Sequence, residues 1–223
     1  MKAVIFDFDG TLTHKGINTW KKIWTMLGYD TVNENSVYKK QMRDYLNKVT
    51  TYQEWCDQTC LYYRKGKLKK SDFSKIAETM NFVDGLEDFL KELKSNNLSL
   101  QIVSGNFTEI IKHALGEKVK YFDSINANNL EFDENEIISK IVGTNYDYEG
   151  KAKFIDEYCL KNNINPADIC FVGNGDNDQW AYLSGCKTIC VNPDTKTVSN
   201  KSVWHKKVEN VKNLTTLLPL ILN

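Results

Sequence analysis

Acidic and hydroxyl side chains follow two short apolar runs of this 223-residue sequence. Asp7 and Asp9 come directly after AVIF at residues 3–6, and Ser104 comes directly after LSLQIV at residues 98–103. Both runs have the composition of buried β-strands. A carboxylate can act as a nucleophile or hold a metal, and a hydroxyl can donate a hydrogen bond to an oxyanion. The two runs therefore deliver reactive groups at strand ends.

A third strand-like run, ICFV, leads into GNGDND, which contains Asn174, Asp176 and Asp178, and Lys151 opens a predicted helix upstream of it. Ligands of open parallel sheets collect at the carboxyl ends of the strands. The four positions together supply a nucleophile, a metal site, a hydroxyl donor and a cation. This is a complete set for phosphoryl transfer.

The segments around these residues have to form a parallel sheet. From about residue 82 onwards, helix-like and strand-like segments alternate, which is the pattern of an α/β sheet covered by helices. The predicted strands lie at 98–103, 121–125, 169–172 and 187–191, with a hairpin around 133–135 and helices at 86–93, 107–115, 151–161 and 214–222. Pro219 should kink or shorten the last helix.

Residues 17–80 have a different pattern, with apolar side chains at helical spacing in four successive segments. Thr51 and Glu54 have the spacing of a capping box at the start of the third segment. We predict a helical bundle inserted into one α/β domain. The predicted division is a core of residues 1–14 and 82–223 and an all-α cap of residues 15–81.

Composition narrows the range of partners. The 29 basic and 29 acidic residues balance, so no global charge attracts nucleic acid or an anionic membrane, and a small-molecule partner is favoured. No apolar stretch reaches membrane-spanning length and the amino terminus lacks a signal-peptide pattern, which predicts a cytosolic protein. Six scattered cysteines predict reduced, buried thiols. The sequence predicts no particular oligomeric state.

DFDGT at 7–11, VSGN at 103–106, the lysine and GNGDND at 173–178 occur in a fixed order. As an ordered set they resemble the four motifs of the haloacid dehalogenase superfamily. The similarity is to the phosphoserine phosphatase-like branch and covers most of residues 1–200, with the inserted helices in the place of the superfamily's cap. The resemblance implies a Rossmann-like core and a magnesium-dependent phosphatase that acts on a small phosphorylated metabolite.

The resemblance also implies roles for single residues. Asp7 would attack phosphorus to form an aspartyl-phosphate, and Asp9 would protonate the leaving oxygen and later deprotonate water. Lys151 would neutralise the charge on Asp7 and the phosphoryl group. Ser104 and residues near it would bind phosphoryl oxygens, and the expected phosphate-binding positions also include Gly10, Thr11, Gly105 and Asn106.

The metal ligands implied by the resemblance are Asp7, the Asp9 backbone carbonyl, Asn174 and Asp178. The superfamily places an aspartate at the position of Asn174, and an amide oxygen ligates without bringing a charge. Asp176 is a further carboxylate that could compensate. The choice among the three residues of the GNGDND segment stays open at this stage.

The cap should supply the substrate contacts. Phosphoserine phosphatases carry a glutamate at the position of Gly16 and a cap arginine near Thr59, so we expect a substrate other than phosphoserine. Arg43 and Arg64 are the two arginines of the chain. They could grip a carboxylate or a second phosphate, or they could form ion pairs on the surface.

Two alternatives to a hydrolase remain. A phosphomutase or phosphotransferase would pass the aspartyl-phosphate to a substrate hydroxyl. A non-catalytic phosphate-binding module would keep the fold and lose metal affinity, which is an interpretation that Asn174 allows.

Overall fold

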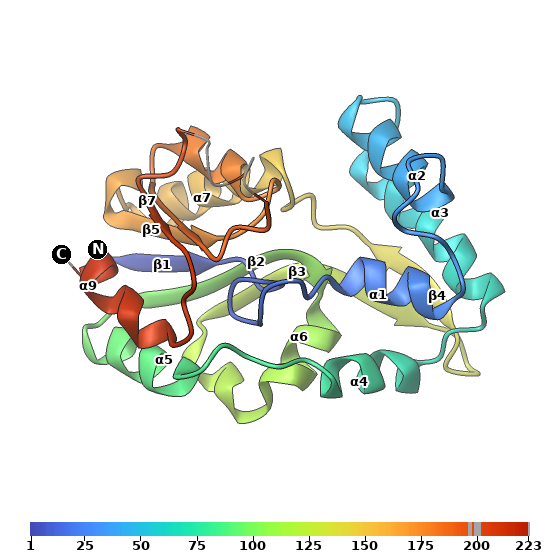
Figure 1. The fold of residues 1–223 in the computed structure, drawn as a ribbon, viewed down its shortest axis with the longest axis horizontal. Coiled ribbons are helices and arrows are strands. Elements are labelled where there is room, and N and C mark those ends of the chain that lie inside the picture. Colours follow the sequence, from blue (N-terminus) through green and yellow to red (C-terminus); the bar gives the residue numbers. More distant parts are fainter. Residues whose placement is uncertain (196–197, 199–201, 223) are drawn as a thin grey trace.

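The computed structural model describes residues 1–195, 198 and 202–222 and arranges them around a seven-stranded sheet (Figure 1). The strands are β1 Ala3–Phe6, β2 Ser99–Phe107, β3 Ser124–Phe132, β4 Ile138–Val142, β5 Ile169–Gly173, β6 Lys187–Val191 and β7 Lys206–Val208. They lie in the order β4-β3-β2-β1-β5-β6-β7. Neighbouring strands are parallel except β3 and β4, which form the predicted hairpin. The predicted α/β fold class is confirmed.

Helices fill the connections between the strands. The α-helices are α1 Thr19–Met26, α2 Val37–Leu46, α3 Tyr52–Lys65, α4 Lys70–Glu78, α5 Leu86–Ser95, α6 Thr108–Leu115, α7 Glu149–Asn162 and α9 Leu218–Leu222. Short 3-10 helices are η1 Gly116–Tyr121, η2 Pro166–Asp168, η3 Gln179–Ser184 and η4 Leu214–Leu217. The predicted terminal helix is thus a 3-10 turn followed by a short α-helix at Pro219, whose missing N–H is tolerated in a first helical turn.

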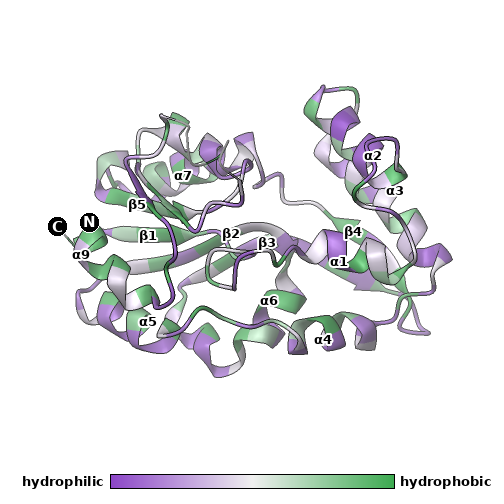
Figure 2. Ribbon diagram, viewed as in Figure 1, coloured by the Kyte–Doolittle hydropathy of each residue, from purple (hydrophilic) through white to green (hydrophobic). Residues whose placement is uncertain are grey.

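The two faces of the sheet pack against different helices. Along β1, Val4 and Phe6 belong to a core cluster shared with α5, α6 and η4, whereas Ala3 and Ile5 belong to a second cluster shared with α7. This alternation follows from the two-residue period of a strand. Figure 2 shows the resulting pattern, with hydrophobic central strands and hydrophilic residues on the outer sides of the helices.

The helical segment leaves the core and returns to it at adjacent points. Thr13 and Phe82 form an isolated antiparallel bridge, and the His14 amide donates to the Asn81 carbonyl at 3.0 Å. The four predicted helices are present, and Thr51 and Glu54 form the predicted capping box. They are not packed only on one another, because α3 lies on β4 and α4 lies on α6. The division at residues 14/15 and 81/82 stays a prediction.

Three strands differ from the sequence-based expectation. The strand predicted at 121–125 is observed as β3 at Ser124–Phe132, because the chain before it forms the 3-10 helix η1 up to Tyr121. β2 continues past residue 103 to Phe107, with an irregular register against β3 where the predicted phosphate-binding residues lie. Such irregularities re-aim side chains near functional sites. β7 was not predicted, because a three-residue edge strand with two lysines gives too short a pattern.

The environment of the cysteines and the character of the helices were also predicted from the sequence. All six cysteines are buried free thiols, as predicted. Within the described residues, none of the helices combines the length and the apolar character needed to cross a bilayer.

Candidate active site

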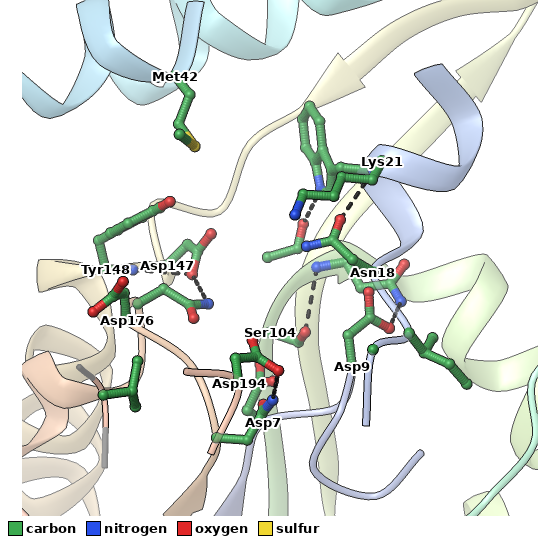
Figure 3. A pocket seen from close by; sticks show the side chains of 18 of the residues that line it. Asp7, Asp9, Asn18, Lys21, Met42, Ser104, Asp147, Tyr148, Asp176 and Asp194 are labelled. Atoms are coloured by element: carbon green, nitrogen blue, oxygen red, sulfur yellow. Dashed lines mark hydrogen bonds between the residues drawn. The ribbon is translucent and has the colours of Figure 1, made fainter. Parts of the chain in front are cut away.

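Three neighbouring strands bring the predicted reactive residues to one edge of the sheet. β1 lies between β2 and β5, and the Asp7 amide extends the ladder by donating to the Val172 carbonyl at 2.9 Å. Asp7 and Asn174 directly follow β1 and β5, Ser104 lies in the carboxyl-terminal half of β2, and all three are at most 4% exposed. All three line a cavity of about 540 Å³ between the sheet and the helical segment (Figure 3).

Lys151, in the first turn of α7, does not line the cavity but contacts Asp7, which does. We refer to Asp7, Asp9 and Asn174, together with the buried Lys151 and Asp178 behind them, as the floor of the cavity. The Lys151 side chain is fully buried, and Nζ donates to Asp7 Oδ1 at 2.8 Å and to Asp178 Oδ1. Burial lowers the pKa of Lys151, but the charges of Asp178 and Asp7 outweigh it and raise that pKa overall. The lysine is therefore a permanent cation beside the predicted nucleophile.

Asp178 has a different place from the one we predicted. Oδ1 accepts from Lys151, and Oδ2 accepts from the backbone amides of Asn174 at 2.7 Å and Gly175 at 2.8 Å. A fully buried carboxylate with both oxygens engaged has little left to offer a metal. We therefore remove Asp178 from the candidate metal ligands and assign it to positioning Lys151 and the GNGDND loop.

The carboxylates around Lys151 exceed the positive charge that it supplies. Burial, and then the charge of Asp178, raise the pKa of Asp7 to about 8, while Lys151 opposes the shift. A further cation at Asp7 would favour the ionised carboxylate that a nucleophile requires.

Asp9 is held between the helical segment and β2. Its carboxylate accepts from the Thr19 amide at 2.6 Å, the Thr19 hydroxyl at 3.1 Å and Asn106 Nδ2 at 2.8 Å. Burial raises the pKa of Asp9 to about 6, although these hydrogen bonds favour the charged form. A carboxyl group with such a pKa can exchange a proton near neutral pH. Asn106 is thus placed to orient Asp9.

The DFDGT turn lies against Asn174. Thr11 Oγ1 donates to Asn174 Oδ1 at 3.0 Å, and a Cβ on Gly10 would lie 2.4 Å from Asn174 Nδ2. Gly10 also has a φ of 76°, which favours glycine. In the structure, Gly10 and Thr11 therefore pack and orient Asn174, while their predicted contact with phosphate stays a prediction.

Gly105 sits where three other segments converge. Its carbonyl accepts from Trp20 Nε1 and Asn128 Nδ2, both at 2.7 Å. A Cβ here would lie 2.3 Å from Asp147 Oδ2, so the close approach requires glycine. Ser104 beside it is buried and lines the cavity. The backbone at Gly105, which should hold a phosphoryl group, is thus held in place by residues of the cap, of β3 and of the segment before α7.

The oxygen donors near Asp7 suit magnesium. They are the Asp7 carboxylate, the Asp9 backbone carbonyl and the Asn174 amide oxygen, and magnesium takes oxygen ligands while keeping several waters. The described residues contain no cluster of three or more His, Cys, Asp or Glu side chains that could hold a metal. The three oxygen donors would hold a magnesium ion together with waters and phosphate.

The cap contributes one wall of the cavity. Residues from the cap that line it include Trp20, Lys21, Tyr38 and Met42, and Figure 3 shows Lys21 extending into it from α1. Trp20 is stacked between Trp55 and Phe107, with ring centroids 5.3 Å apart in each pair. This stack joins the cap wall to β2.

Neither predicted arginine lies in that wall. Arg43 turns to Glu34, where it contacts the backbone carbonyl and, at 3.5 Å, the carboxylate, and Arg64 is exposed on α3. Neither side chain lines the cavity. We therefore correct this assignment, because neither side chain reaches the cavity in which a substrate would bind.

Three residues at the site were not predicted from the sequence. Thr19 binds Asp9, Asp147 accepts from Asn177 Nδ2 at 2.8 Å, and Asp194 accepts from Asn174 Nδ2 at 2.8 Å. Asp194 follows β6, so the strand-end rule that identified the others would have found it. Thr19 and Asp147 lie on segments with no such signal.

The structure thus combines a mostly parallel α/β sheet with paired carboxylates and a buried lysine at the carboxyl ends of its central strands. A family model of the haloacid dehalogenase-like hydrolases matches residues 1–181. The chain therefore belongs to the haloacid dehalogenase-like hydrolases, and the predicted superfamily and enzyme class are confirmed.

Curated relatives bear the name phosphoserine phosphatase. The chain is 28% identical over 151 residues to one from Archaeoglobus fulgidus, covering 66% of this chain and 42% of the relative. It is 25% identical to one from Saccharomyces cerevisiae over 99% of this chain and 67% of the relative. A third, from Methanocaldococcus jannaschii, is 26% identical, with 79% of each chain covered. The chain thus spans less than half of the Archaeoglobus relative.

Solved structures show the same fold. A phosphoserine phosphatase in apo form has a TM-score of 0.75 and 20% identity, and a phospho-aspartyl intermediate analogue of phosphoserine phosphatase has a TM-score of 0.73 and 21% identity. Each match covers 99% of this chain and 98% of the other. At these identities the similarity concerns the fold.

Proposed function

We propose that the chain is a magnesium-dependent phosphatase that hydrolyses a small phosphomonoester through an aspartyl-phosphate on Asp7. The observation that carries the proposal is Lys151, buried between Asp7 and Asp178, with Asp9 held beside them in the same cavity. Replacing a whole buried ion cluster by well-packed apolar side chains is often neutral or stabilising, so stability alone does not account for the presence of Lys151, Asp7 and Asp178 together. The buried cation does serve a reaction in which negative charge builds up at the nucleophile.

The proposed reaction has two steps. An Asp7 oxygen attacks phosphorus, the bond from phosphorus to the leaving oxygen breaks, and Asp9 gives its proton to that oxygen. Asp9 then takes a proton from water as the water attacks the aspartyl-phosphate, which releases phosphate and restores Asp7. Ser104 and the amides after it would bind the phosphoryl oxygens.

Magnesium would be held by Asp7, the Asp9 carbonyl and Asn174. When bound, it would supply positive charge to the phosphoryl oxygens. Lys151 holds Asp7 in place, and the Thr19 and Asn106 contacts hold Asp9 where it can move a proton.

We further propose that the substrate is not phosphoserine. Gly16 lines the cavity at the position where the resemblance places an amine-binding glutamate, and Thr59 is fully buried against Gln41 at the position of the carboxylate-binding arginine. The relatives named phosphoserine phosphatase make phosphoserine the reference substrate. Phosphoserine turnover with a kcat/KM above that of every other phosphomonoester in a panel would contradict this part of the proposal.

The main test compares the wild type with Asp7→Asn on an aryl phosphate, with and without magnesium, by release of inorganic phosphate. We expect turnover only in the wild type with magnesium, because an amide cannot form the acyl-phosphate. Asp168→Asn, at the opposite end of β5, is the control and should retain wild-type rates. Equal rates in the wild type and Asp7→Asn would refute an aspartyl-phosphate at this site.

A further inference from the structure

Asn174 holds its side-chain amide in one orientation. Oδ1 accepts from Thr11 Oγ1 at 3.0 Å, Nδ2 donates to Asp194 Oδ1 at 2.8 Å, and the residue is 2% exposed. A reversed amide would place its oxygen against the Asp194 carboxylate, which repels it. Asp194 therefore fixes the amide oxygen of Asn174 on the side of the DFDGT turn, where the proposed magnesium ligands lie.

Asp194 is itself built into the site. It lies in the loop after β6, it lines the cavity, and its backbone amide donates to the Asn174 carbonyl at 3.1 Å. Lys15 donates to the carbonyl of the preceding residue, Pro193, which ties the loop to the first residue of the predicted cap. Figure 3 labels Asp194 among the residues that line the cavity, as Asp7 does.

The Asp178 carboxylate is not directed at the side chain of Asn174. Its two oxygens accept from Lys151 and from the two loop amides. Asp194, in contrast, accepts a hydrogen bond from Asn174, the one uncharged side chain among the proposed metal ligands.

We propose that Asn174 and Asp194 together provide the oxygen ligand and the negative charge that a single metal-binding aspartate would provide. Asn174 gives the oxygen that binds the ion, and Asp194, one hydrogen bond behind it, is a positioning residue that orients the amide and supplies the negative charge. Carboxylates in such positions behind metal ligands orient them and increase their donor strength. This inference rests on the proposed function, because it assumes that magnesium binds beside Asp7.

The test measures magnesium affinity directly by calorimetry, without substrate, in four proteins: the wild type, Asp194→Asn, Asn174→Asp and the double variant Asn174→Asp/Asp194→Asn. We expect Asp194→Asn to weaken binding about 10- to 100-fold, the usual effect of losing a residue that supports a metal ligand. Asn174→Asp alone should not improve binding, because it places two carboxylates in hydrogen-bonding contact. The double variant, with the charge moved to position 174, should bind at least as tightly as the wild type.

The control is Asp168→Asn, which removes the same charge at the opposite end of β5 and should leave the affinity unchanged. A second measurement is the rise in thermal unfolding temperature on adding magnesium, which follows the affinity of the folded state and also shows that each variant folds. Folded Asp194→Asn with wild-type affinity would overturn the proposal. So would Asn174→Asp with an affinity equal to that of the double variant, because Asp194 would then be independent of position 174.

The two proposals fail in different ways. A wild type that binds magnesium and turns over substrate, beside an unchanged Asp194→Asn, would overturn the role of Asp194 alone. A wild type with no magnesium binding would overturn both.

Discussion

The floor and the cap wall of the cavity are built on different principles. On the floor, Lys151, Asp178 and Asn174 are at most 2% exposed, and each has at least two hydrogen-bonding partners. On the cap wall, Lys21 is exposed and points into the cavity from a helix. The positions of the floor side chains are therefore fixed by their neighbours. The wall side chains, in contrast, can be substituted without moving the residues proposed to react. Substitutions on the floor should affect stability and turnover, and those on the wall should affect substrate preference.

The largest effect is expected at Lys151. Lys151→Met would leave Asp7 and Asp178 buried without their cation, and removal of one partner from a buried ion pair typically costs ~3–5 kcal/mol. We expect a loss of this size in the free energy of unfolding by urea, together with loss of turnover. Lys153→Met on the same helix is the matched control, because Lys153 is exposed and forms a surface ion pair with Glu157. Similar losses in both variants would show that the floor is no more constrained than the surface.

The second effect concerns Asp9, whose carboxylate belongs to the floor but is tied to the cap through Thr19. Asp9→Asn should slow turnover by ~10²- to 10⁴-fold, because the proton carrier is lost. Magnesium affinity should change much less, because the proposed ligand is the backbone carbonyl. Turnover is measured with a generic aryl phosphate and affinity by calorimetry. Unchanged turnover would remove Asp9 from the mechanism.

The difference between floor and wall also explains what the sequence could predict. Strand-end residues such as Asp7, Ser104 and Asn174 were found because a parallel sheet brings consecutive strand ends to one edge. Asp194 obeys the same rule and was missed only because the end of β6 was not considered. Asp147 follows an irregular segment, so only the folded chain shows that it reaches Gly105.

The cap wall was predicted less well. Arg43 and Arg64 were selected by residue type, but the direction of a helix face depends on what it packs against. Arg43, in the last turn of α2, pairs with Glu34, which precedes this helix, and the cavity is lined by Lys21 and Lys39 instead. The helices themselves were predictable from their spacing, whereas their packing on β4 and α6 depends on contacts distant in sequence.

A smaller effect is expected at Lys21. Lys21→Gln should lower kcat/KM for an aryl phosphate that carries a carboxylate by about two- to fivefold relative to the unsubstituted aryl phosphate, since an exposed charge pair contributes ~0.2–1 kcal/mol. Lys22, the next residue in the sequence, is the control, because its side chain donates to Thr79 and does not line the cavity. Lys22→Gln should keep the wild-type ratio. A Lys21→Gln variant with an unchanged ratio would show that the cap lysine does not meet the leaving group.

The smallest effect is expected at Arg43. Arg43→Ala removes its contacts with the Glu34 carbonyl and carboxylate, and partly exposed ion pairs contribute ~0.2–1 kcal/mol. We therefore expect a decrease in the free energy of unfolding of at most about 1 kcal/mol, measured with urea, and an unchanged order of preference across a panel of phosphomonoesters. The position is informative because residue type alone favoured Arg43 as a substrate contact, while its direction in the structure favours a role in holding the segment before α2. If preference changed in Arg43→Ala but not in Lys21→Gln, the cap wall that meets the substrate would be formed by α2 rather than by α1, and Arg43 would have to leave Glu34 to reach it.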